Sequence, residues 1–239
     1  MCGRYALRAR PEELRDLFGP LDQPDMPPRY NIAPTQPIAI VVSEGGRRRL
    51  KPVRWGFIPS WVGDPDRFSL IINARSETAH EKPTFRAALK RRRCLVPASG
   101  FYEWAGDGKT GKTPYWIAPR AGGVIAFAGL WETWSGADGC EVDTAAIMTT
   151  SANEALAPLH HRMPVVIDPK AFDFWLDAEG PADALAPLFE PVADDFFATH
   201  PVSRRVNQVR NDDADLIAPA EPDDPPADRG DDAGQLSLF

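Results

Sequence analysis

Short apolar runs separated by turn-forming residues dominate the chain from position 37 to position 150. The runs are rich in Val, Ile, Phe and Trp, which favour strands. Two polar, Gly-containing connections, SEGG (43–46) and AGDGKTGK (105–112), are typical of hairpin loops. The pattern predicts strands over residues 37–42, 48–55, 93–104, 114–119, 123–131 and 144–150.

Three other segments have the spacing of amphipathic helices. Residues 11–18 begin with a proline, which suits the first helical position, and repeat apolar side chains on one face. Residues 82–92 form a second candidate, and residues 168–175 begin with an aspartate cap followed by proline. Because strands predominate and do not alternate with helices in βαβ order, we expect a single α+β domain of mainly antiparallel, barrel-like sheet with flanking helices.

The net charge of −7 is concentrated at the C-terminal end. Residues 212–239 hold nine acids and one arginine, a net of −8, and subtracting −8 from −7 leaves +1 for residues 1–211. The body is therefore close to neutral, so affinity for nucleic acid has to come from a local cluster of cations. We place one folded domain at residues 1–217. Residues 218–239 form an acidic tail that buries too little apolar surface to fold, and we expect it to be disordered.

Cysteine and histidine usage argues against several classes of protein. The three cysteines are scattered and never form a CxxC pair, and the four histidines lack metal-ligand spacing. We therefore expect neither disulfides nor a bound metal or other cofactor, as in a reducing cytoplasm. The chain has no run of about 18 apolar residues and no leader-like N-terminus, so we expect neither a membrane span nor secretion.

Cys2 is the first residue with distinctive chemistry. Removal of Met1 before a small second residue would leave an exposed cysteine with a free α-amine. The ordinary pKa is about 7.7–8.0 for the amine and about 8.5 for the thiol, so both are partly deprotonated near neutral pH. Together they form a 1,2-aminothiol, which condenses with an aldehyde first to an imine and then to a thiazolidine. The alternative is a cysteine that follows the initiator methionine by chance.

Three further groups of polar residues are candidates for a site. Asn73 begins a polar stretch (73–78) after the apolar run 69–72, which suits either the rim of a site behind a buried strand or a turn cap. Glu103 stands among aromatic residues, so its pKa is either raised for acid–base work or ordinary on a solvent-facing strand position. The segment 160–162, His-His-Arg, combines proton transfer with phosphate binding, or else caps a turn.

Basic and aromatic residues add two weaker signals. The run 90–93, Lys-Arg-Arg-Arg, ends a predicted helix, where the helix dipole favours cations whether or not they contact DNA. Trp55, Trp61 and Trp104 have rings that could stack on bases, although tryptophans in such strands are more often part of the core.

Nine segments, taken together, are far more specific than any single residue. They cover the body of the chain in order: MCGRY (1–5), YNIAPTQ (30–36), RWGFIPSW (54–61), INARSET (72–78), FRAALKRRRCLVPASGFYEW (85–104), TPYWI (113–117), FAGLWETW (127–134), HHRMPVVI (160–167) and HPVSRRVNQVRNDDADLI (200–217). With these motifs the chain resembles the SRAP family (SOS response-associated peptidase), the abasic-site processing proteins. The resemblance implies a β-rich α+β domain, in agreement with the strand pattern.

The resemblance also implies a role for each candidate residue. Cys2 would be the nucleophile that forms a thiazolidine link to the abasic-site aldehyde, and Asn73 would position the sugar and the cysteine. Glu103 and His160 would divide the proton transfers that open the closed sugar. We assign this role to His160 because His161 occupies the variable position of the HxRMP motif.

The implied partner is single-stranded DNA that contains abasic sites. Arg4, Arg75 and Arg162 would contact its phosphates, which gives binding that is independent of sequence and weaker at high salt. The resemblance further implies lyase-like, single-turnover capture, and we expect a monomer in a bacterial cytoplasm, at the nucleoid during repair. The alternative is an N-terminal-nucleophile cysteine peptidase that removes its own Met1.

The terminal pentapeptide, residues 235–239, is unlike the tail that precedes it. It resembles the motif that binds the bacterial sliding clamp, with Leu236, Leu238 and Phe239 filling an apolar groove after Gln235. The acidic tail would then be a tether of about 25–30 Å that raises the effective concentration near a clamp. An incidental apolar end is the alternative.

Overall fold

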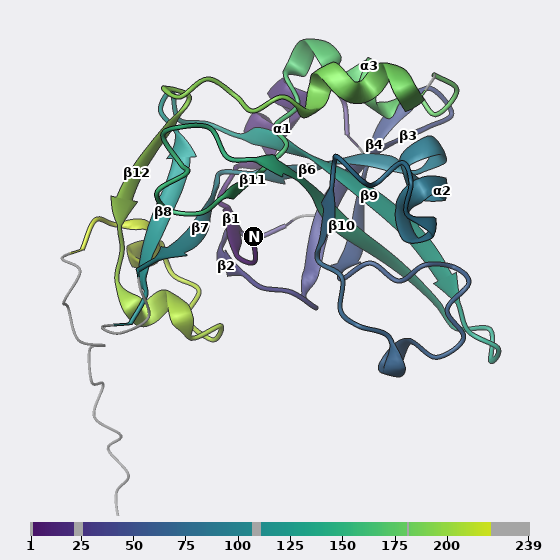
Figure 1. Ribbon diagram of the computed structural model, residues 1–239, viewed down its shortest axis with the longest axis horizontal. Helices are drawn as coiled ribbons and strands as arrows, with labels where there is room; N and C mark the ends of the chain where they lie inside the picture. The colour runs from purple at the N-terminus through teal and green to yellow at the C-terminus, as the bar shows by residue number, and fades with distance from the viewer. Residues whose placement is uncertain (1, 22–25, 107–110, 181, 221–239) are drawn as a thin grey trace, which may run out of the picture.

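The computed structural model describes residues 2–21, 26–106, 111–180 and 182–220. Within them the chain forms two sheets with short helices around them (Figure 1). The strands are β1 (Tyr5–Leu7), β2 (Arg29–Ile32), β3 (Pro37–Glu44), β4 (Arg47–Trp55), β5 (Asn73–Arg75), β6 (Arg93–Ala98), β7 (Gly100–Ala105), β8 (Thr113–Pro119), β9 (Ile125–Ser135), β10 (Glu141–Ser151), β11 (Arg162–Pro164) and β12 (Phe197–Pro201).

Five strands of the larger sheet close into a barrel in the order β4–β3–β6–β9–β10. Neighbours in this ring are antiparallel except β10 and β4, which pair in parallel through Thr144–Arg54 and Ala145–Trp55 and complete the closure. The short strands β5 and β11 extend the pairing along β10. The expected α+β class with a mainly antiparallel, barrel-like sheet is therefore confirmed.

The second sheet has the order β12–β8–β7–β1–β2 and is antiparallel throughout. Figure 1 shows it beside the barrel, with β1 and β2 toward the middle of the molecule. Since β1 pairs with β7 through Tyr5–Phe101, the start of the chain lies beside the strand that carries Glu103. The two motifs are far apart in the sequence and adjacent in the sheet.

All three predicted helices form, as α1 (Pro11–Phe18), α2 (Pro83–Arg91) and α3 (Phe172–Leu176). The third starts with a 3₁₀ turn, η2 (Pro169–Ala171), which Asp168 caps by accepting from the Lys170 N–H at 2.8 Å. None of the described helices has the length and apolar character needed to cross a bilayer. The remaining 3₁₀ segments are η1 (Pro65–Arg67), η3 (Ala182–Phe189), η4 (Arg204–Asn207) and η5 (Ala214–Ile217).

Two predicted strands differ from the structure. The run 93–104 divides at Ser99 into β6 of the barrel and β7 of the second sheet. Glycine at position 100 lets the chain pass close to Trp116 at this break, since a Cβ there would stand 2.5 Å from the Trp116 ring. The buried strand expected at 69–72 is wrong: Ser69 and Leu70 are exposed, and the strand is β5, the NAR segment itself.

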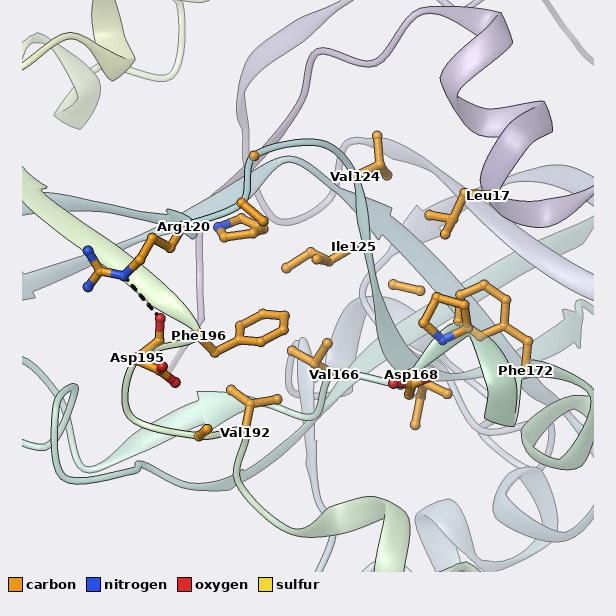
Figure 2. A pocket seen from close by; sticks show the side chains of 17 residues that line it. Leu17, Arg120, Val124, Ile125, Val166, Asp168, Phe172, Val192, Asp195 and Phe196 are labelled. Atoms are coloured by element: carbon orange, nitrogen blue, oxygen red, sulfur yellow. Dashed lines mark hydrogen bonds between the residues drawn. The ribbon is translucent and has the colours of Figure 1, made fainter.

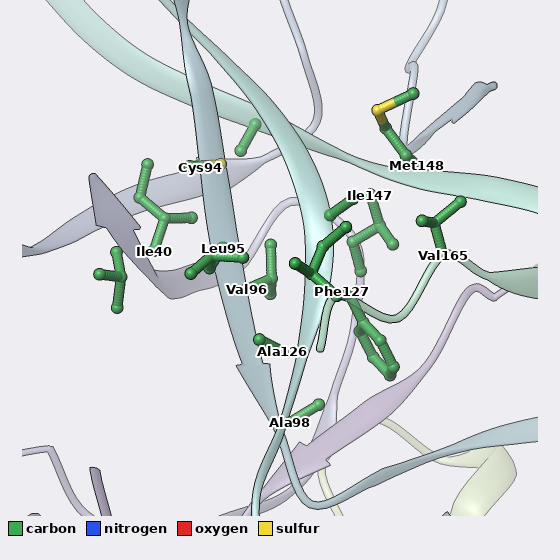
Figure 3. Close-up of a cluster of buried hydrophobic side chains, with 14 of the residues drawn as sticks. Ile40, Cys94, Leu95, Val96, Ala98, Ala126, Phe127, Ile147, Met148 and Val165 are labelled. Carbon is green, nitrogen blue, oxygen red and sulfur yellow. The ribbon is translucent and has the colours of Figure 1, made fainter. Parts of the chain in front are cut away.

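Apolar side chains of the barrel strands form one continuous core (Figure 3). Leu95 of β6, Phe127 of β9 and Ile147 of β10 are fully buried. Tyr5 of β1 packs edge-on against Trp55 and Phe127, with ring centroids 5.3 and 6.5 Å apart. The first strand therefore shares the core of the barrel, and Trp55 belongs to this core rather than to a surface that stacks on bases.

Arg93, from the basic run 90–93, is a buried cation that joins α2 to α3. Its guanidinium donates to the backbone oxygens of Leu89, Lys90, Trp175 and Asp177. Arg93→Ala leaves these carbonyls without their donor, so we expect the free energy of unfolding to fall by about 3 kcal/mol in urea denaturation. Arg91→Ala removes an exposed cation from the same run and is the control. Equal stabilities of the two variants would contradict this structural role.

Candidate functional site

Cys2 lies directly before β1 and is fully buried (0% exposed) in the chain that still carries Met1. The expectation of an exposed cysteine is therefore wrong for this form of the protein. Burial raises the pKa of the thiol well above its usual range, and the negative charge of Glu103 raises it further. The thiol is consequently neutral at pH 7, not partly ionised as its ordinary pKa suggests. Its reaction requires a group that accepts the proton.

Asn73 connects Cys2 to the barrel. It begins β5, where it pairs in parallel with Ile147 of β10. Its side-chain Nδ2 donates to the backbone oxygen of Cys2 at 3.0 Å. Its Oδ1 is buried and has no hydrogen-bond partner among the described residues. Asn73 thus fixes the cysteine backbone and keeps one buried acceptor available beside it.

Glu103 is a buried carboxylate on β7, opposite Tyr115 of β8. Only 5% of the residue is exposed, so the solvent-facing interpretation is wrong. Burial raises the pKa of this carboxyl above its usual range, and the positive charge of Lys112 partly opposes the rise. Since its charge acts on the Cys2 thiol, Glu103 and Cys2 share one electrostatic environment. A carboxyl with a raised pKa is suited to donate as well as to accept a proton in acid–base chemistry.

His160 lies just before β11, with its ring stacked on His161 at a centroid distance of 4.3 Å. Its Nδ1 lies 3.0 Å from the Arg162 backbone nitrogen and 3.3 Å from the Arg162 backbone oxygen, so the backbone of Arg162 orients the ring. Partial burial lowers the pKa of His160, and the charge of Lys112 contributes to the lowering. The charge of Lys112 therefore acts on the pKa of both His160 and Glu103.

Two of the three predicted phosphate-binding arginines make internal contacts. Arg4 Nη1 donates to Asn31 Oδ1 at 2.7 Å and to the Val206 backbone oxygen at 2.8 Å. Arg162 is buried and forms a bidentate ion pair with Glu77 through contacts of 2.5 and 2.8 Å. These contacts give both arginines a role in holding the site together.

Arg75 differs from the other two arginines because its side chain is exposed at the end of β5. Within the described part of the chain no ion pair to Arg75 is found. Trp61 is also exposed, at 62%, and packs edge-on against Phe68 with ring centroids 5.9 Å apart. A free cation and an exposed aromatic ring are the groups that bind a nucleic-acid backbone and its bases.

Asn31 and Asp212 are structural residues of the site that the sequence interpretation did not single out. The Asn31 amide donates to the backbone oxygens of Val206, Gln208 and Asn211. Asp212 accepts from the backbone N–H groups of Tyr30 and Asn31 and from the Arg29 side chain. The segment 204–212 is thereby fixed over Arg4. Their positions inside the YNIAPTQ and RNDDADLI motifs were the available signal.

Tyr5 is a third residue that the sequence interpretation did not single out. Its hydroxyl is fully buried and has no hydrogen-bond partner among the described residues. Burial raises the pKa of this phenol, and the neighbouring Cys2 adds to the rise. Tyr5 therefore places a weakly acidic hydroxyl in the same buried region as the cysteine.

An apolar pocket of about 720 Å³ is formed by α1, the turn between β8 and β9, and the segments before α3 and β12 (Figure 2). Figure 2 shows Val124, Ile125, Val166 and Phe196 around it, with Arg120 hydrogen-bonded to the Asp195 backbone oxygen at one rim. None of the candidate site residues lines this pocket. The candidate site residues and this apolar pocket are therefore separate features of the molecule.

Comparison with known proteins identifies the family of the chain. A family model described as SOS response associated peptidase (SRAP) matches residues 1–209. The chain belongs to the SRAP family. Cys2, Asn73, Glu103 and His160 all lie within the matched range.

Several curated SRAP relatives align with most of the chain. The abasic site processing protein YoqW of Bacillus subtilis (strain 168) is 37% identical over 222 residues, covering 91% of this chain and 99% of that protein. YedK of Escherichia coli (strain K12), named in the same way, is 31% identical over 227 residues, covering 92% and 100%. HMCES of Gallus gallus is 32% identical over 266 residues, covering 92% and 78%.

Solved structures share the fold of this chain. A protein from Bacteroides thetaiotaomicron superposes with a TM-score of 0.83 at 24% identity, covering 92% of this chain and all of that one. A phage-related protein from Bordetella bronchiseptica gives a TM-score of 0.68 at 30% identity, covering 85% of this chain and 95% of that one.

Proposed function

We propose that this protein processes abasic sites in single-stranded DNA by forming a covalent thiazolidine between Cys2 and the aldehyde of the open abasic sugar, which shields the site during repair. The observation that carries the proposal is the hydrogen bond from Asn73 Nδ2 to the Cys2 backbone oxygen. The charge of Glu103 also acts on the buried Cys2 thiol. The names of the SRAP relatives, abasic site processing proteins, support the same substrate.

The reaction begins with loss of Met1, which frees the α-amine of Cys2. The amine adds to the aldehyde carbon, and expulsion of one water molecule gives an imine. The thiol sulfur then adds to the imine carbon, and the thiol proton ends on the ring nitrogen. The closed five-membered ring is far more stable than the imine, so reversible capture becomes durable attachment.

The site residues supply what this sequence of steps needs. The abasic sugar is mostly a closed hemiacetal, so its opening requires a proton donor and a proton acceptor. The raised pKa of Glu103 moves this carboxyl toward neutral pH, and the lowered pKa of His160 keeps its ring neutral and able to accept a proton at pH 7. Glu103 also accepts the proton of the neutral Cys2 thiol as sulfur attacks. Asn73 Oδ1 accepts from the amine or a sugar hydroxyl, and Asn73 Nδ2 holds the cysteine in place.

Binding of the strand rests on positive and aromatic groups around this centre. Arg75 is the predicted phosphate contact that is exposed, and Arg4 and Arg162 keep their neighbours in position while adding positive charge. The exposed Trp61 ring offers a face on which a base can stack. Such binding is independent of sequence and requires an unpaired strand, because a duplex hides the sugar from a recessed cysteine.

The experiment that tests the proposal uses one oligonucleotide in two forms, with and without an abasic site. After incubation with the Met1-processed protein, we expect a species on a denaturing gel that resists heat and detergent with the abasic form alone. The same abasic site placed in a fully paired duplex should give much less adduct. Equal labelling of the intact and abasic strands would contradict the proposal.

A second function, N-terminal-nucleophile peptidase activity, is favoured by the description of the family as a peptidase. In its simplest form Cys2 cuts only the bond that follows Met1. The test replaces Cys2 by a residue before which the host aminopeptidase normally removes methionine. If the mutant protein nevertheless retains Met1, Cys2 itself cleaves this bond. Turnover of peptides in trans, unaffected by abasic DNA, would support a general peptidase instead.

The clamp-binding assignment of Gln235, Leu236, Leu238 and Phe239 concerns residues outside the described part of the chain. We propose that this pentapeptide recruits the protein to the bacterial sliding clamp through an apolar groove on the clamp. Deletion of residues 235–239 should abolish co-elution with the clamp in size-exclusion chromatography and leave adduct formation with free abasic DNA intact. A mutant with residues 235–239 in scrambled order is the control for length and composition. Clamp binding that survives the deletion would refute the assignment.

A further inference from the structure

Lys112 and Arg204 are two cations that lie together beside the candidate site. Lys112 precedes β8 and is exposed, and Arg204 begins η4. An Nη atom of Arg204 lies 3.9 Å from the place where a Cβ on Gly111 would stand, so the guanidinium lies against the residue before Lys112. Among the described residues neither cation forms an ion pair. Two cations on neighbouring segments repel each other, and an anion that binds between them removes this repulsion.

The contrast with Arg205 indicates that this arrangement is specific to Arg204. Arg205 follows it in the same 3₁₀ turn and is neutralised by Asp213 through contacts of 2.7 and 3.3 Å. Arg204 has a buried Nε without a hydrogen-bond partner in the described structure. A buried donor of this kind costs free energy until an acceptor binds. Arg205 is therefore neutralised within the fold, whereas Arg204 keeps a donor for an acceptor from outside the protein.

The position of the two cations relative to the reactive groups is fixed by their neighbours. Lys112 directly precedes Thr113 of β8, which pairs with Ala105, two residues beyond Glu103 on β7. Its charge also acts on Glu103 and His160. The turn that carries Arg204 also carries Asn207, whose Oδ1 accepts from Trp104 Nε1 at 2.7 Å. The Trp104 ring is thus fixed against the η4 turn, on the strand that also carries Glu103.

We infer that Lys112 and Arg204 form a phosphate-binding pair that holds the DNA backbone on one side of the abasic nucleotide, with Trp104 as the adjacent stacking surface. A bridging phosphate accepts from the Lys112 ammonium and from the Arg204 guanidinium, including the orphaned Nε. This assignment rests on the proposed function, because it takes the strand to pass over Cys2. The assignment predicts asymmetric binding, because Lys112 and Arg204 contact the DNA backbone on only one side of the abasic nucleotide.

The first test measures affinity for an unmodified single strand, so that no covalent step is involved. Lys112→Gln, Arg204→Gln and the double mutant are compared with Arg205→Gln, which removes a neutralised cation from the same turn. The dependence of log Kd on log salt concentration should become shallower by about 0.7 for each single mutant and by about 1.4 for the double mutant. Arg205→Gln should leave the slope unchanged. Arg204→Lys should restore most of the slope. Slopes that are equal in all variants would overturn the pair.

The second test uses two abasic oligonucleotides of equal length, one with the abasic site near the 5′ end and one with it near the 3′ end. The double mutant should form adduct more slowly at limiting protein concentration with only one of the two, since the pair contacts one side. Equal slowing on both would overturn the asymmetric assignment. The wild-type protein separates the two proposals. If it forms no adduct with either oligonucleotide, covalent capture itself is contradicted. If it forms adduct and the double mutant is slowed equally on both oligonucleotides, only the Lys112–Arg204 pair is contradicted.

Discussion

Cys2→Ala is expected to abolish the covalent adduct with abasic DNA completely. The alanine mutant keeps an α-amine after loss of Met1, so it can still form an imine with the aldehyde. It has no sulfur to close the ring, and the imine hydrolyses when the protein is denatured. Denaturing electrophoresis after incubation with an abasic strand measures the difference, which should exceed a factor of 100 in adduct yield, that is about 2.7 kcal/mol or more.

Three further variants separate the thiol from the amine and from general effects. Cys2→Ser should behave like the alanine mutant, apart from a labile imine that borohydride can trap. An N-terminal extension that blocks the α-amine should be as damaging as loss of the thiol, because both groups enter the ring. Cys140→Ala is the matched control, since Cys140 is an exposed cysteine away from the site. A stable adduct of the Cys2→Ala mutant would contradict the proposed chemistry.

Glu103→Gln is expected to slow adduct formation by about 10²–10⁴-fold, the usual contribution of a positioned acid or base. The amide keeps the size of the side chain but cannot accept the thiol proton. In the wild type the rate should fall as the pH drops through the pKa of Glu103. Because burial raises this pKa above its ordinary value of about 4.3, the decline should begin at a higher pH than for an exposed glutamate. The mutant should lack this acidic limb.

Glu132→Gln provides the control for the effect of Glu103. Glu132 is also a buried glutamate with a pKa raised by burial, but it lies on β9 and pairs with Arg92 at 3.2 Å. Its substitution should leave the rate and pH profile of adduct formation unchanged. The two profiles are measured by single-turnover kinetics between about pH 4 and pH 9. If the rate of the Glu103→Gln mutant falls at low pH as in the wild type, a group other than Glu103 causes this fall.

The sequence predicted the parts of the fold that local pattern determines. Helices with a proline start and apolar spacing, and long strands joined by glycine-containing turns, form where expected. Strands β1, β2, β5, β11 and β12 were not predicted, and β5 and β11 illustrate why, because both are short and pair with the distant strand β10. Residues 73–75 contain two polar residues and residues 162–164 an arginine and a proline, so only pairing with β10 makes them strands.

The composition of the site was predicted better than its physical state. The motifs placed Cys2, Asn73, Glu103 and His160 in one family, and the structure gives contacts or shared electrostatics among them. The burial of Cys2 and the engagement of Arg162 by Glu77 depend on packing between segments about 80 residues or more apart, which no local pattern encodes. Burial changes the chemistry, because a neutral thiol needs a proton acceptor, the role that we propose for Glu103.

Intact-protein mass spectrometry after incubation with an abasic single strand tests the capture of the aldehyde by Cys2 most directly. The predicted adduct has the mass of the chain without Met1 plus the mass of the oligonucleotide, minus one water molecule. This balance follows from an aldehyde that condenses with both the amine and the thiol. The spectrum should show the same chain without Met1 as the unreacted protein. A chain that retains Met1 and forms no adduct, or an adduct that forms equally with Cys2→Ala, would contradict covalent capture through the N-terminal cysteine.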